Sequence, residues 1–366
     1  MKICYLGNAR SIHVQRWIKF FSDNGHEVHI FSFDSTDIRN AELHQLRRFT
    51  PQLPFIFSPI NLITYVIQIK RLIKRIKPDI LHAHYIHGYG VIGALTGFHP
   101  FVASAWGSDI FFTRNSSIQR AEIKYALNRA DLITCNGENL KKAILEHNID
   151  KNKIQIIYHG VDTKEFNPKK RDNKIARKIF GNENSQIVIS TRSLEPIYDI
   201  VTLIRAIPLI LKRMPLVNFL IIGGGSEKSN LVKLAQSYKV LDRIKFLGSV
   251  SHMKLPKLLL ASDVYVSTSL SDGTAISTLE AMACGVAPVI TDIVANRIWI
   301  KNDVNGFMFP KRDPIILAEK IVCILRNKKV IKKFAELNTR MVKEKADYYK
   351  EMGKMEDLYE KLVKKI

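Results

Sequence analysis

Residues 269–291, SLSDGTAISTLEAMACGVAPVIT, place two carboxylates around one short stretch of chain. Asp272 stands beside Gly273 in a segment typical of a loop, and Glu280 lies inside a predicted helix, with seven residues between the two acids. If most of that span is helical, eight steps of about 1.5 Å put the two backbones on the order of 12 Å apart. Carboxyl pairs that act on one glycosidic bond lie roughly 5–9.5 Å apart. The spacing therefore favours two acids that hold opposite ends of an extended ligand.

The residues between the acids would offer free backbone N–H groups at a helix N-terminus, which is a ready anion site. These residues are Gly273, Thr274, Ala275 and Ile276. An anion flanked by two hydroxyl-bearing rings describes a nucleotide-diphosphate sugar, with Glu280 on the ribose and Asp272 on the transferred sugar. The alternative is an ordinary helix with Asp272 as its N-cap and Glu280 as a solvated surface acid. Spacing alone leaves both interpretations open.

The rest of the chain alternates short apolar runs with amphipathic stretches up to about residue 162, and the pattern restarts at residue 186. Strands separated by helices predict parallel sheets with right-handed crossovers. We expect an α/β protein of two Rossmann-like domains that face each other across a cleft, where ligands bind at the carboxyl ends of the strands. The expected domains are 1–165, on the acceptor side, and 166–345, on the nucleotide-sugar side. A C-terminal helix, 346–366, is expected to pack back toward the first domain.

Composition narrows the classes of partner. The chain has 56 Lys and Arg against 34 Asp and Glu, a formal charge of +22 over 366 residues. Such a charge predicts a polyanionic neighbour, which could be nucleic acid, an anionic membrane surface or a phosphorylated substrate. The alternative is a proteome that simply uses much lysine. A nucleic-acid-binding protein would interleave basic residues with exposed aromatics in a recognised module, and no such module is evident.

Cysteine usage and apolar runs predict a cytoplasmic chain. The four cysteines lie far apart, without redox or zinc spacing, which is typical of reduced thiols. The N-terminus, MKICYLGNAR, does not resemble a signal peptide. Prolines interrupt the charge-free run 51–69, so we expect no transmembrane segment.

Arg192 falls at the end of the first predicted strand of the second half. A guanidinium there can clamp a diphosphate with two parallel hydrogen bonds. The alternative for this side chain is an interdomain salt bridge.

With these residues in place, the chain resembles the large family of retaining glycosyltransferases of GT-B fold that carries an E-x7-E motif, the group 1 glycosyltransferases. The specific matches lie in the second half: SDGTAISTLEAMACGVAPVI, IIYHGVDTKEFNP, RSLEPIYDIVTLIRAI, FLIIGGGSE, IKFLGSVSHMKLPKLLLASDVYVSTS and NGFMFP. The first half matches less tightly, through GHEVHIFSF, PDILHAHY, AWGSDIF and ADLITCNGENLKKAIL. Together these stretches cover nearly the whole chain.

The resemblance implies roles for individual residues. Glu280 would bind the ribose hydroxyls, and Asp272, in place of the family's first glutamate, would hold a hydroxyl of the transferred sugar. Arg192 would stabilise the leaving diphosphate. Gly223 and Gly225 would let the nucleotide approach the backbone. No dedicated metal site and no cofactor beyond the donor are expected, because no Asp-x-Asp stands at a strand end.

Three positions depart from the family pattern. Asp272 is one methylene shorter than glutamate, roughly 1.5 Å less reach. Tyr198 stands where the family usually has a phosphate-binding lysine, and Trp106 stands where many members have a histidine. These departures leave open a transferase that binds its donor without turnover.

Three residues of the first half are further candidates. His84 lies at a predicted strand end and is an acceptor-side candidate, with a structural role as the alternative. Asp109 could receive or orient the acceptor hydroxyl, or else cap a helix. His13 follows the first strand and could face the diphosphate. His82 and His87 accompany His84 in HAHYIHGYG, but no nearby carboxylate or thiolate completes a metal site.

The predicted helix 61–77 combines an apolar face with a basic end. Its candidates for contact with anionic lipid are Lys70, Arg71, Lys74 and Arg75. We expect the apolar face to pack on the sheet, with the basic end free to touch a membrane.

The sequence thus predicts a glycosyltransferase that moves a sugar, with retention, from a nucleotide-diphosphate sugar to a cell-envelope, polysaccharide or lipid-linked glycan. We expect it to be cytoplasmic, with peripheral contact at the inner face of the cell membrane. An alternative is a nucleotide-sugar 2-epimerase of the same fold. A basic nucleic-acid-binding protein is the non-enzyme alternative.

Overall fold

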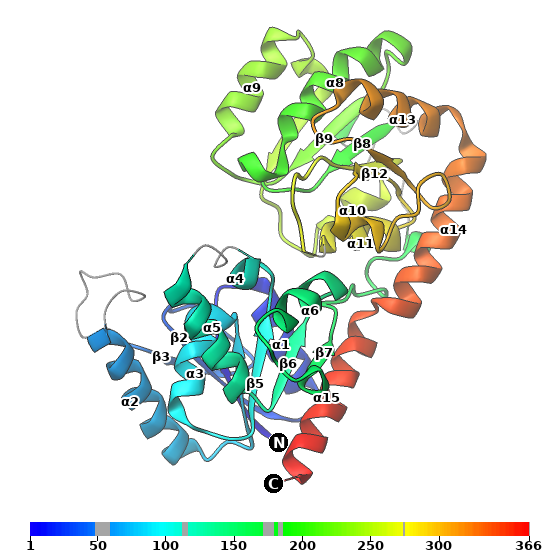
Figure 1. The fold of residues 1–366 in the computed structure, drawn as a ribbon. Coiled ribbons are helices and arrows are strands. Elements are labelled where there is room, and N and C mark those ends of the chain that lie inside the picture. The colour runs from blue at the N-terminus through cyan, green and yellow to red at the C-terminus, as the bar shows by residue number, and fades with distance from the viewer. Residues whose placement is uncertain (48–58, 112–115, 171–178, 182–185, 274, 366) are drawn as a thin grey trace. The chain divides into compact units, whose positions relative to one another are not determined.

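The computed structural model describes residues 1–47, 59–111, 116–170, 179–181, 186–273 and 275–365. The chain forms two compact units (Figure 1). The N-terminal unit comprises Met1–His159 and Tyr349–Ile366, and the C-terminal unit comprises Gly160–Tyr348. Each unit is built on one parallel sheet, so the predicted α/β class with two Rossmann-like domains is confirmed. No helix in the described part of the chain is long and apolar enough to cross a membrane.

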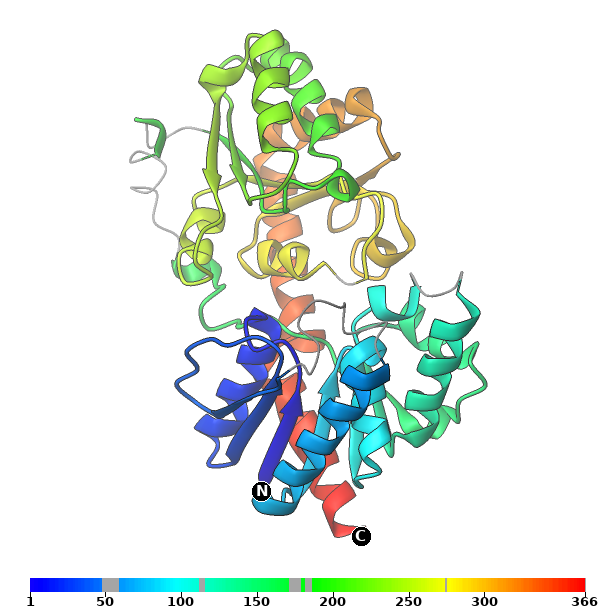
Figure 2. The same cartoon turned by 90° about the vertical axis from the view of Figure 1, so that its left-hand side faces the viewer.

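The N-terminal unit has a seven-stranded sheet in the order β3-β2-β1-β4-β5-β6-β7. Its strands are β1 (Lys2–Leu6), β2 (Glu27–Ser32), β3 (Glu42–Gln45), β4 (Ile80–His84), β5 (Phe101–Ala105), β6 (Leu132–Cys135) and β7 (Ile154–Ile156). Its helices are α1 (Ile12–Asp23), α2 (Pro59–Ile76), α3 (Val91–Thr96), α4 (Ser108–Phe111), α5 (Ser117–Arg129), α6 (Glu138–Leu145) and α15 (Tyr348–Lys364), with a π-helical turn, η2 (Ile86–Gly90). In Figure 2 the dark blue N-terminal strands form one edge of this sheet.

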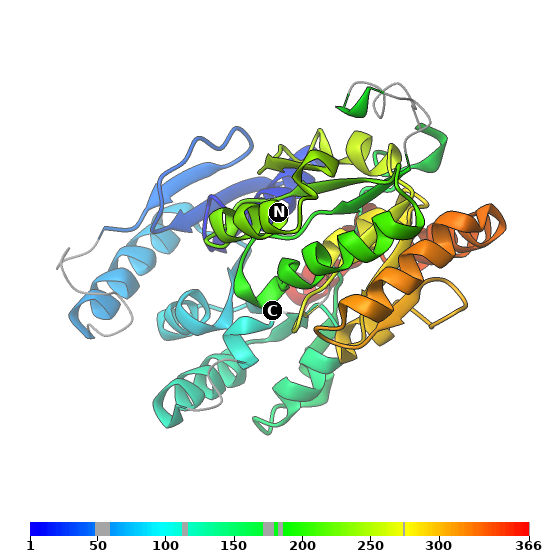
Figure 3. The ribbon, with the colours of Figure 1, turned by 90° about the horizontal axis from the view of Figure 1, so that it is seen from above.

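The C-terminal unit has a six-stranded sheet in the order β10-β9-β8-β11-β12-β13. Its strands are β8 (Ile187–Ser190), β9 (Asn218–Ile222), β10 (Ile244–Gly248), β11 (Val264–Ser267), β12 (Ala287–Thr291) and β13 (Phe307–Phe309). Its helices are α8 (Ile200–Arg213), α9 (Lys228–Ser237), α10 (Leu255–Leu260), α11 (Ile276–Ala283), α12 (Val294–Arg297), α13 (Pro314–Arg326) and α14 (Lys328–Lys345). Helices α8 and α13 lie side by side in Figures 1 and 3.

Both sheets contain strands that are buried along their whole length. β4, β5, β8, β9, β11 and β12 are buried at every position, as expected for strands covered on both faces by crossover helices. Each sheet and its helices enclose a separate apolar core. The carboxyl ends of the parallel strands then carry the loops in which the candidate residues lie.

The C-terminal helix α15 belongs to the N-terminal unit through buried polar contacts. The hydroxyl of Tyr359 hydrogen-bonds Nδ1 of His82, at the centre of the first sheet. The carboxylate of Glu351 accepts the backbone N–H of Tyr158 at 2.9 Å. Helix α15 therefore closes one side of this unit.

The short strand β3 is absent from the sequence prediction. Its residues, ELHQ, contain a single apolar side chain, and the strand lies at the edge of the sheet. Edge strands need no second apolar face, so hydrophobic periodicity gives no signal for them.

Candidate functional site

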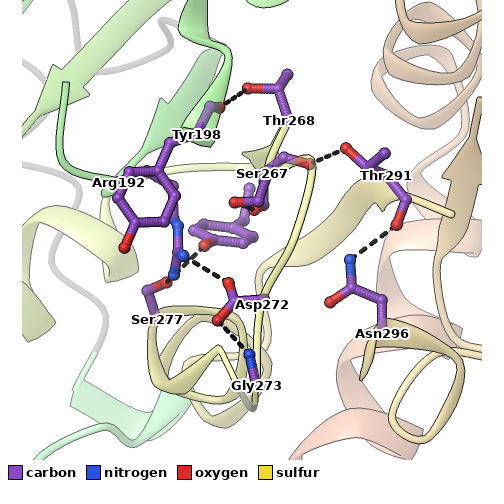
Figure 4. A network of polar contacts seen from close by, with 11 residues as sticks. Arg192, Tyr198, Ser267, Thr268, Asp272, Gly273, Ser277, Thr291 and Asn296 are labelled. Atoms are coloured by element: carbon purple, nitrogen blue, oxygen red, sulfur yellow. Dashed lines mark hydrogen bonds and ion pairs between the residues drawn. The ribbon is translucent and has the colours of Figure 1, made fainter. Parts of the chain in front are cut away.

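Arg192 is the centre of a polar network in the C-terminal unit (Figure 4). It follows β8 by two residues and is only 9% exposed. Its Nη2 donates to Oδ2 of Asp272 at 2.5 Å, and its Nη1 donates to Oγ of Ser277 at 2.9 Å. Its guanidinium carbon lies 4.3 Å from the ring centroid of Tyr198. The predicted arginine and the first predicted acid therefore do come together, within one unit and not as an interdomain pair.

The Arg192 guanidinium stays charged although it is buried. Burial acts to lower its pKa, but the Asp272 carboxylate, with Tyr265 and Tyr198 acting in the same direction, raises the pKa above its ordinary value. The Nε–H of Arg192 has no hydrogen-bond partner among the described residues. A buried charged donor without a partner is costly, and an anionic ligand would satisfy it.

Asp272 uses both carboxyl oxygens. Oδ2 receives Arg192, and Oδ1 accepts the backbone N–H of its neighbour Gly273 at 3.0 Å. Helix α11 begins at Ile276, with Ala275 as the N-cap, so the alternative in which Asp272 caps the helix is wrong. Within the span 272–280, residues 276–280 belong to the helix.

The start of α11 has the properties of an anion site. Ala275 has no side-chain oxygen to accept a hydrogen bond, so no side chain at the N-cap position satisfies the first-turn N–H groups of Ile276 and Ser277. Thr274, which was predicted to contribute an N–H group here, lies outside the described residues.

Glu280 is a buried residue, so the alternative of a solvated surface acid is wrong. The residue is 5% exposed, and its Oε1 lies 2.8 Å from Nε2 of His252. His252 follows β10 in the loop before α10 and lies 5.3 Å, between ring centroids, from Phe166. Sequence reasoning missed His252, although the matched stretch GSVSHMKLP contains it at a strand end.

Gly223 and Gly225 have a packing role in the structure, and the nucleotide approach that the resemblance implies stays a prediction. They follow β9 with φ values of +141° and +156°. A Cβ at Gly223 would lie 2.4 Å from the carbonyl oxygen of Arg192, and a Cβ at Gly225 would lie 2.3 Å from that of Leu194. The chain's own backbone fills the space beside both glycines, so their direct function is to let the Arg192–Leu194 loop pack against β9. They thereby position Arg192.

Tyr198, at the position of the expected lysine, contacts Arg192 through its ring and Thr268 through its backbone. It ends the 3₁₀ turn Pro196–Tyr198, and its backbone oxygen accepts the hydroxyl of Thr268 at 2.7 Å. Its ring lies against the Arg192 guanidinium, a cation–π contact that fixes the arginine without adding a charge.

On the other side of the network, Asn296 donates to the Thr291 backbone oxygen at 2.7 Å (Figure 4).

In the N-terminal unit, Asp109 is a structural carboxylate and not an acceptor-side group. It is 1% exposed and accepts the backbone N–H groups of Ile86, Gly107 and Trp106 at 2.7, 2.8 and 3.0 Å. Burial raises its pKa, and the hydrogen bonds to the backbone act against that rise. Asp109 thus joins the loops that follow β4 and β5, which corrects the prediction of contact with an acceptor hydroxyl.

His84 lies inside an aromatic cluster and not on an open surface. Its ring centroid lies 5.0, 5.3 and 5.7 Å from those of Trp17, Tyr5 and Trp106. Burial lowers its pKa well below the ordinary value, and neither ring nitrogen has a hydrogen-bond partner among the described residues. The structure therefore favours the structural alternative for His84 over a role at the acceptor.

His13 is placed near the strand ends of the N-terminal unit. Its ring stacks on that of His159 at 4.8 Å and meets Trp106 edge-on at 5.6 Å. His159 was not singled out from the sequence; burial lowers its pKa well below the ordinary value. The predicted contact of His13 with a diphosphate stays a prediction.

The three histidines of HAHYIHGYG do not form a metal cluster. His82 hydrogen-bonds Ser104 Oγ at 2.6 Å as well as the hydroxyl of Tyr359, and His87 Nδ1 lies 3.7 Å from Glu122. Each ring therefore faces a different neighbour.

The four predicted membrane-contact residues, Lys70, Arg71, Lys74 and Arg75, are all exposed on α2. The predicted apolar face of this helix packs on the sheet: Tyr65, Ile69 and Ile76 lie in the core. The helix also exposes a second apolar set that the sequence analysis did not separate, Ile60, Ile63 and Ile67, at 53%, 60% and 45%.

Two family models match the chain. Glycosyl transferase 4-like matches residues 2–137, and Glycosyl transferases group 1 matches residues 172–345. A glycosyltransferase of Methanocaldococcus jannaschii described as uncharacterized is 27% identical, over 98% of this chain and 95% of that protein. The Escherichia coli UDP-Gal:alpha-D-GlcNAc-diphosphoundecaprenol alpha-1,3-galactosyltransferase is also 27% identical, over 85% of this chain and 82% of that protein.

The fold has close counterparts among solved structures. The crystal structure of Anabaena HepE in complex with UDP superposes with a TM-score of 0.82 at 19% identity and covers 99% of this chain and 100% of that one. Sucrose-phosphate synthase of Thermosynechococcus elongatus gives a TM-score of 0.83 at 18% identity, with 100% of each chain covered. With both halves matched and the two-sheet architecture in place, the chain belongs to the glycosyltransferases of GT-B fold, with a C-terminal half of the group 1 type.

Proposed function

We propose that this glycosyltransferase binds a nucleotide-diphosphate sugar in its C-terminal unit and transfers the sugar, with retention, to a cell-envelope, polysaccharide or lipid-linked glycan. The observation that carries the proposal is the buried Arg192 guanidinium, whose Nε–H lacks a partner among the described residues and which lies beside Asp272 and the start of α11. Two positive sources, a guanidinium and a helix N-terminus, suit a diphosphate.

The two acids give the proposed donor its orientation. Glu280 accepts from His252 through Oε1, and its second oxygen can accept a ribose hydroxyl. Asp272 adjoins Arg192, so a sugar attached to the clamped diphosphate lies within its reach. In the reaction, the bond between the sugar carbon and the diphosphate oxygen breaks, the acceptor hydroxyl oxygen bonds that carbon, and the hydroxyl proton passes to the leaving diphosphate. Negative charge develops on the leaving diphosphate, and Arg192 stabilises it.

This proposed chemistry needs no cofactor beyond the donor, since it is a group transfer with a built-in leaving group. The relatives favour a uridine donor: the Escherichia coli enzyme is named for UDP-galactose, and HepE was crystallised with UDP and with UDP-glucose. The name of the Escherichia coli enzyme also gives a sugar-diphosphoundecaprenol as its acceptor, which favours a lipid-linked acceptor for this chain.

A donor screen tests the proposal. Nucleotide sugars with uridine and guanosine bases are tested for thermal stabilisation of the protein and for release of the nucleoside diphosphate. We expect one class to stabilise the wild-type protein and Glu280→Gln to weaken that effect. The control is Glu336→Gln, an exposed acid on α14 of the same unit, which should behave as wild type. If no nucleotide sugar stabilises the protein, the proposal fails.

The screen also separates the alternatives. A 2-epimerase converts the sugar of the donor without an acceptor, which nuclear magnetic resonance of the products detects. A transferase without turnover binds the donor but releases no nucleoside diphosphate with any acceptor. Nucleic-acid binding would instead give stabilisation by oligonucleotides and none by nucleotide sugars.

We further propose that α2 attaches the protein to the anionic inner face of the cell membrane. At 100° per residue, Ile60, Ile63, Ile67, Lys70 and Lys74 fall on one exposed stripe. Exposed isoleucines with cations on the same stripe suit an interfacial helix, in which side chains enter the lipid boundary and lysines meet the headgroups. Four cations at about 1 kcal/mol each would give on the order of a thousandfold in binding at low salt.

Vesicle sedimentation tests this contact. Replacing Lys70, Arg71, Lys74 and Arg75 by glutamine should abolish binding to vesicles that contain anionic phosphatidylglycerol, and Ile63→Ser should weaken it. The matched control replaces four exposed lysines on α14: Lys328, Lys329, Lys332 and Lys333. Equal loss in both quadruple variants would mean that net charge alone drives binding, and unchanged binding would reject α2 as the contact.

A further inference from the structure

Two histidines and a glutamate meet at the edge of the N-terminal sheet, on strands that carry none of the residues of the proposed donor site. His29 lies on β2, and Glu42 and His44 lie on the edge strand β3. The parallel register pairs His29 with Glu42, and His44 stands two residues further along β3, on the same face of the sheet. The ligand atoms of these three side chains all lie within 4.8 Å of one another.

The pattern behind the cluster is a repeated glutamate-x-histidine. β2 carries Glu27-Val28-His29, and β3 carries Glu42-Leu43-His44. Because side chains alternate along a strand, each glutamate lies on the same face as its histidine. Pairing of the two strands therefore gathers two carboxylates and two imidazoles on one patch.

The distances suit a single tetrahedral cation. Nδ1 of His29 lies 3.1 Å from Nε2 of His44 and 3.4 Å from Oε2 of Glu42, and Nε2 of His44 lies 3.7 Å from Oε1 of Glu42. Zinc binds nitrogen and oxygen donors at about 2.0–2.2 Å in a tetrahedron, which separates neighbouring donors by roughly 3.3–3.6 Å. The two rings contact different oxygens of Glu42, so this exposed side chain would turn to present one oxygen to the cation.

Glu27 prepares His29 for this role. Its Oε1 lies 2.9 Å from Nε2 of His29, so that nitrogen donates its proton to the carboxylate. In the neutral ring the other nitrogen, Nδ1, then carries the lone pair and faces the cluster. A carboxylate that fixes the tautomer of a ligating histidine is the usual support of a zinc ligand.

The surrounding charges are compatible with a dication. Glu27 and Glu42 supply two negative charges, and Lys2 contacts Glu27 at 3.2 Å on its outer side. The pKa of His44 is lowered, mainly by burial, with Glu42 acting against and Arg75 adding to the effect.

We propose that His29, Glu42 and His44 bind a divalent transition metal, zinc by the nature of the donors, with Glu27 orienting His29. Two imidazoles and one carboxylate are donors typical of zinc. Glu42 is an exposed side chain, so a water can complete the tetrahedron. The ion joins the edge strand β3, which has only four residues, to β2. The site is structural and independent of the proposed sugar transfer.

Cobalt and zinc titrations of the full chain, prepared without a histidine tag, test the site. We expect one Co²⁺ per chain with the visible absorption of a four-coordinate cobalt site, displaced by Zn²⁺. His44→Ala should remove this spectrum, and Glu42→Gln should weaken zinc binding by about 10–100-fold. Glu27→Gln should weaken it by about 10-fold, since His29 loses its partner. The control is His99→Ala, an exposed histidine of the same unit that pairs with Asp131.

Each outcome of these titrations either supports or overturns the metal site. Loss in the cluster variants with retention in His99→Ala supports the site. Absence of stoichiometric binding by the wild-type chain, or equal binding by wild type and Glu42→Gln, overturns it and leaves a hydrogen-bonded histidine pair. Glu42 is exposed, so its variant should fold even if His44→Ala does not. Neither result depends on whether the chain turns over a nucleotide sugar.

Discussion

At the scale of single residues, the candidate site depends on how one buried arginine is held. Arg192 meets Asp272, Ser277 and the ring of Tyr198, and each contact leaves its guanidinium in a fixed plane. Its Nε–H has no partner within the described chain, and an incoming phosphate oxygen would supply one. Pre-positioned charge of this kind stabilises a leaving group without reorganisation during the reaction.

Replacing Arg192 by lysine tests this geometry. Lysine keeps the charge but cannot make the planar, forked contacts, so we expect the rate of nucleoside-diphosphate release to fall by about 10²–10³-fold. The measurement is kcat with the donor identified by the screen. Arg297→Lys is the matched control, because Arg297 pairs with Asp292 at 2.6 Å on the exposed surface of the same unit. Equal kcat in both variants would exclude Arg192 from the reaction.

At the scale of elements, the strand ends decide which side chains meet. Glycines at the end of β9 let the loop after β8 pack closely enough to place Arg192. In the N-terminal unit, Asp109 holds the loops after β4 and β5 through three backbone N–H groups. The packing of Gly223 on the Arg192 loop and the contact of Asp109 with Ile86 join segments far apart in the sequence, and no local pattern encodes them.

Gly223→Ala should destabilise the C-terminal unit. The new Cβ would lie 2.4 Å from a backbone oxygen, and overpacking of this kind costs about 1–3 kcal/mol. Gly248→Ala is the control. Gly248 also has a positive φ, +68°, but no atom lies within 4 Å of the new Cβ. Urea unfolding should show a larger loss for Gly223→Ala, and equal losses would mean that positive φ alone matters.

Acid should loosen the attachment of α15 to the N-terminal unit. Burial lowers the pKa of His82 to about 3, below its ordinary value of 6.5. The folded state therefore binds fewer protons than the unfolded state between these values, and stability falls as the pH decreases from 6.5 toward 3. The slope is about 1.4 kcal/mol per pH unit for this one group.

Hydrogen exchange in β4 and α15 at pH 7 and pH 5 measures this effect. Correction for the intrinsic pH dependence of exchange gives the opening free energy at each pH. We expect a smaller opening free energy at pH 5 in the wild type and a weaker pH dependence in His82→Gln. A pH dependence that His82→Gln leaves unchanged would assign the effect to other groups.

The elements also show what the sequence can predict. Short runs such as ILHAH and NFLII, which alternate with helical patterns, predict buried parallel strands correctly. ELHQ of β3 could not be predicted, since an edge strand needs no such run. His252 and the burial of Glu280 were missed for a related reason: their contact joins residues 28 positions apart.

At the scale of the whole molecule, the sequence predicted two parallel-sheet units, and its composition gives the charge of +22 directly. The two family models match the two halves of the chain separately. The C-terminal unit brings together Arg192, Asp272 and the start of α11. The two acceptor-side candidates, Asp109 and His84, are instead buried in the N-terminal unit.

A crystal structure of the protein with the nucleoside diphosphate selected by the donor screen tests the central claim most directly. We predict that the diphosphate contacts the Arg192 guanidinium and the first turn of α11, with the ribose hydroxyls on Glu280. A nucleotide bound with its diphosphate away from Arg192, or with no contact between its ribose and Glu280, would contradict the account.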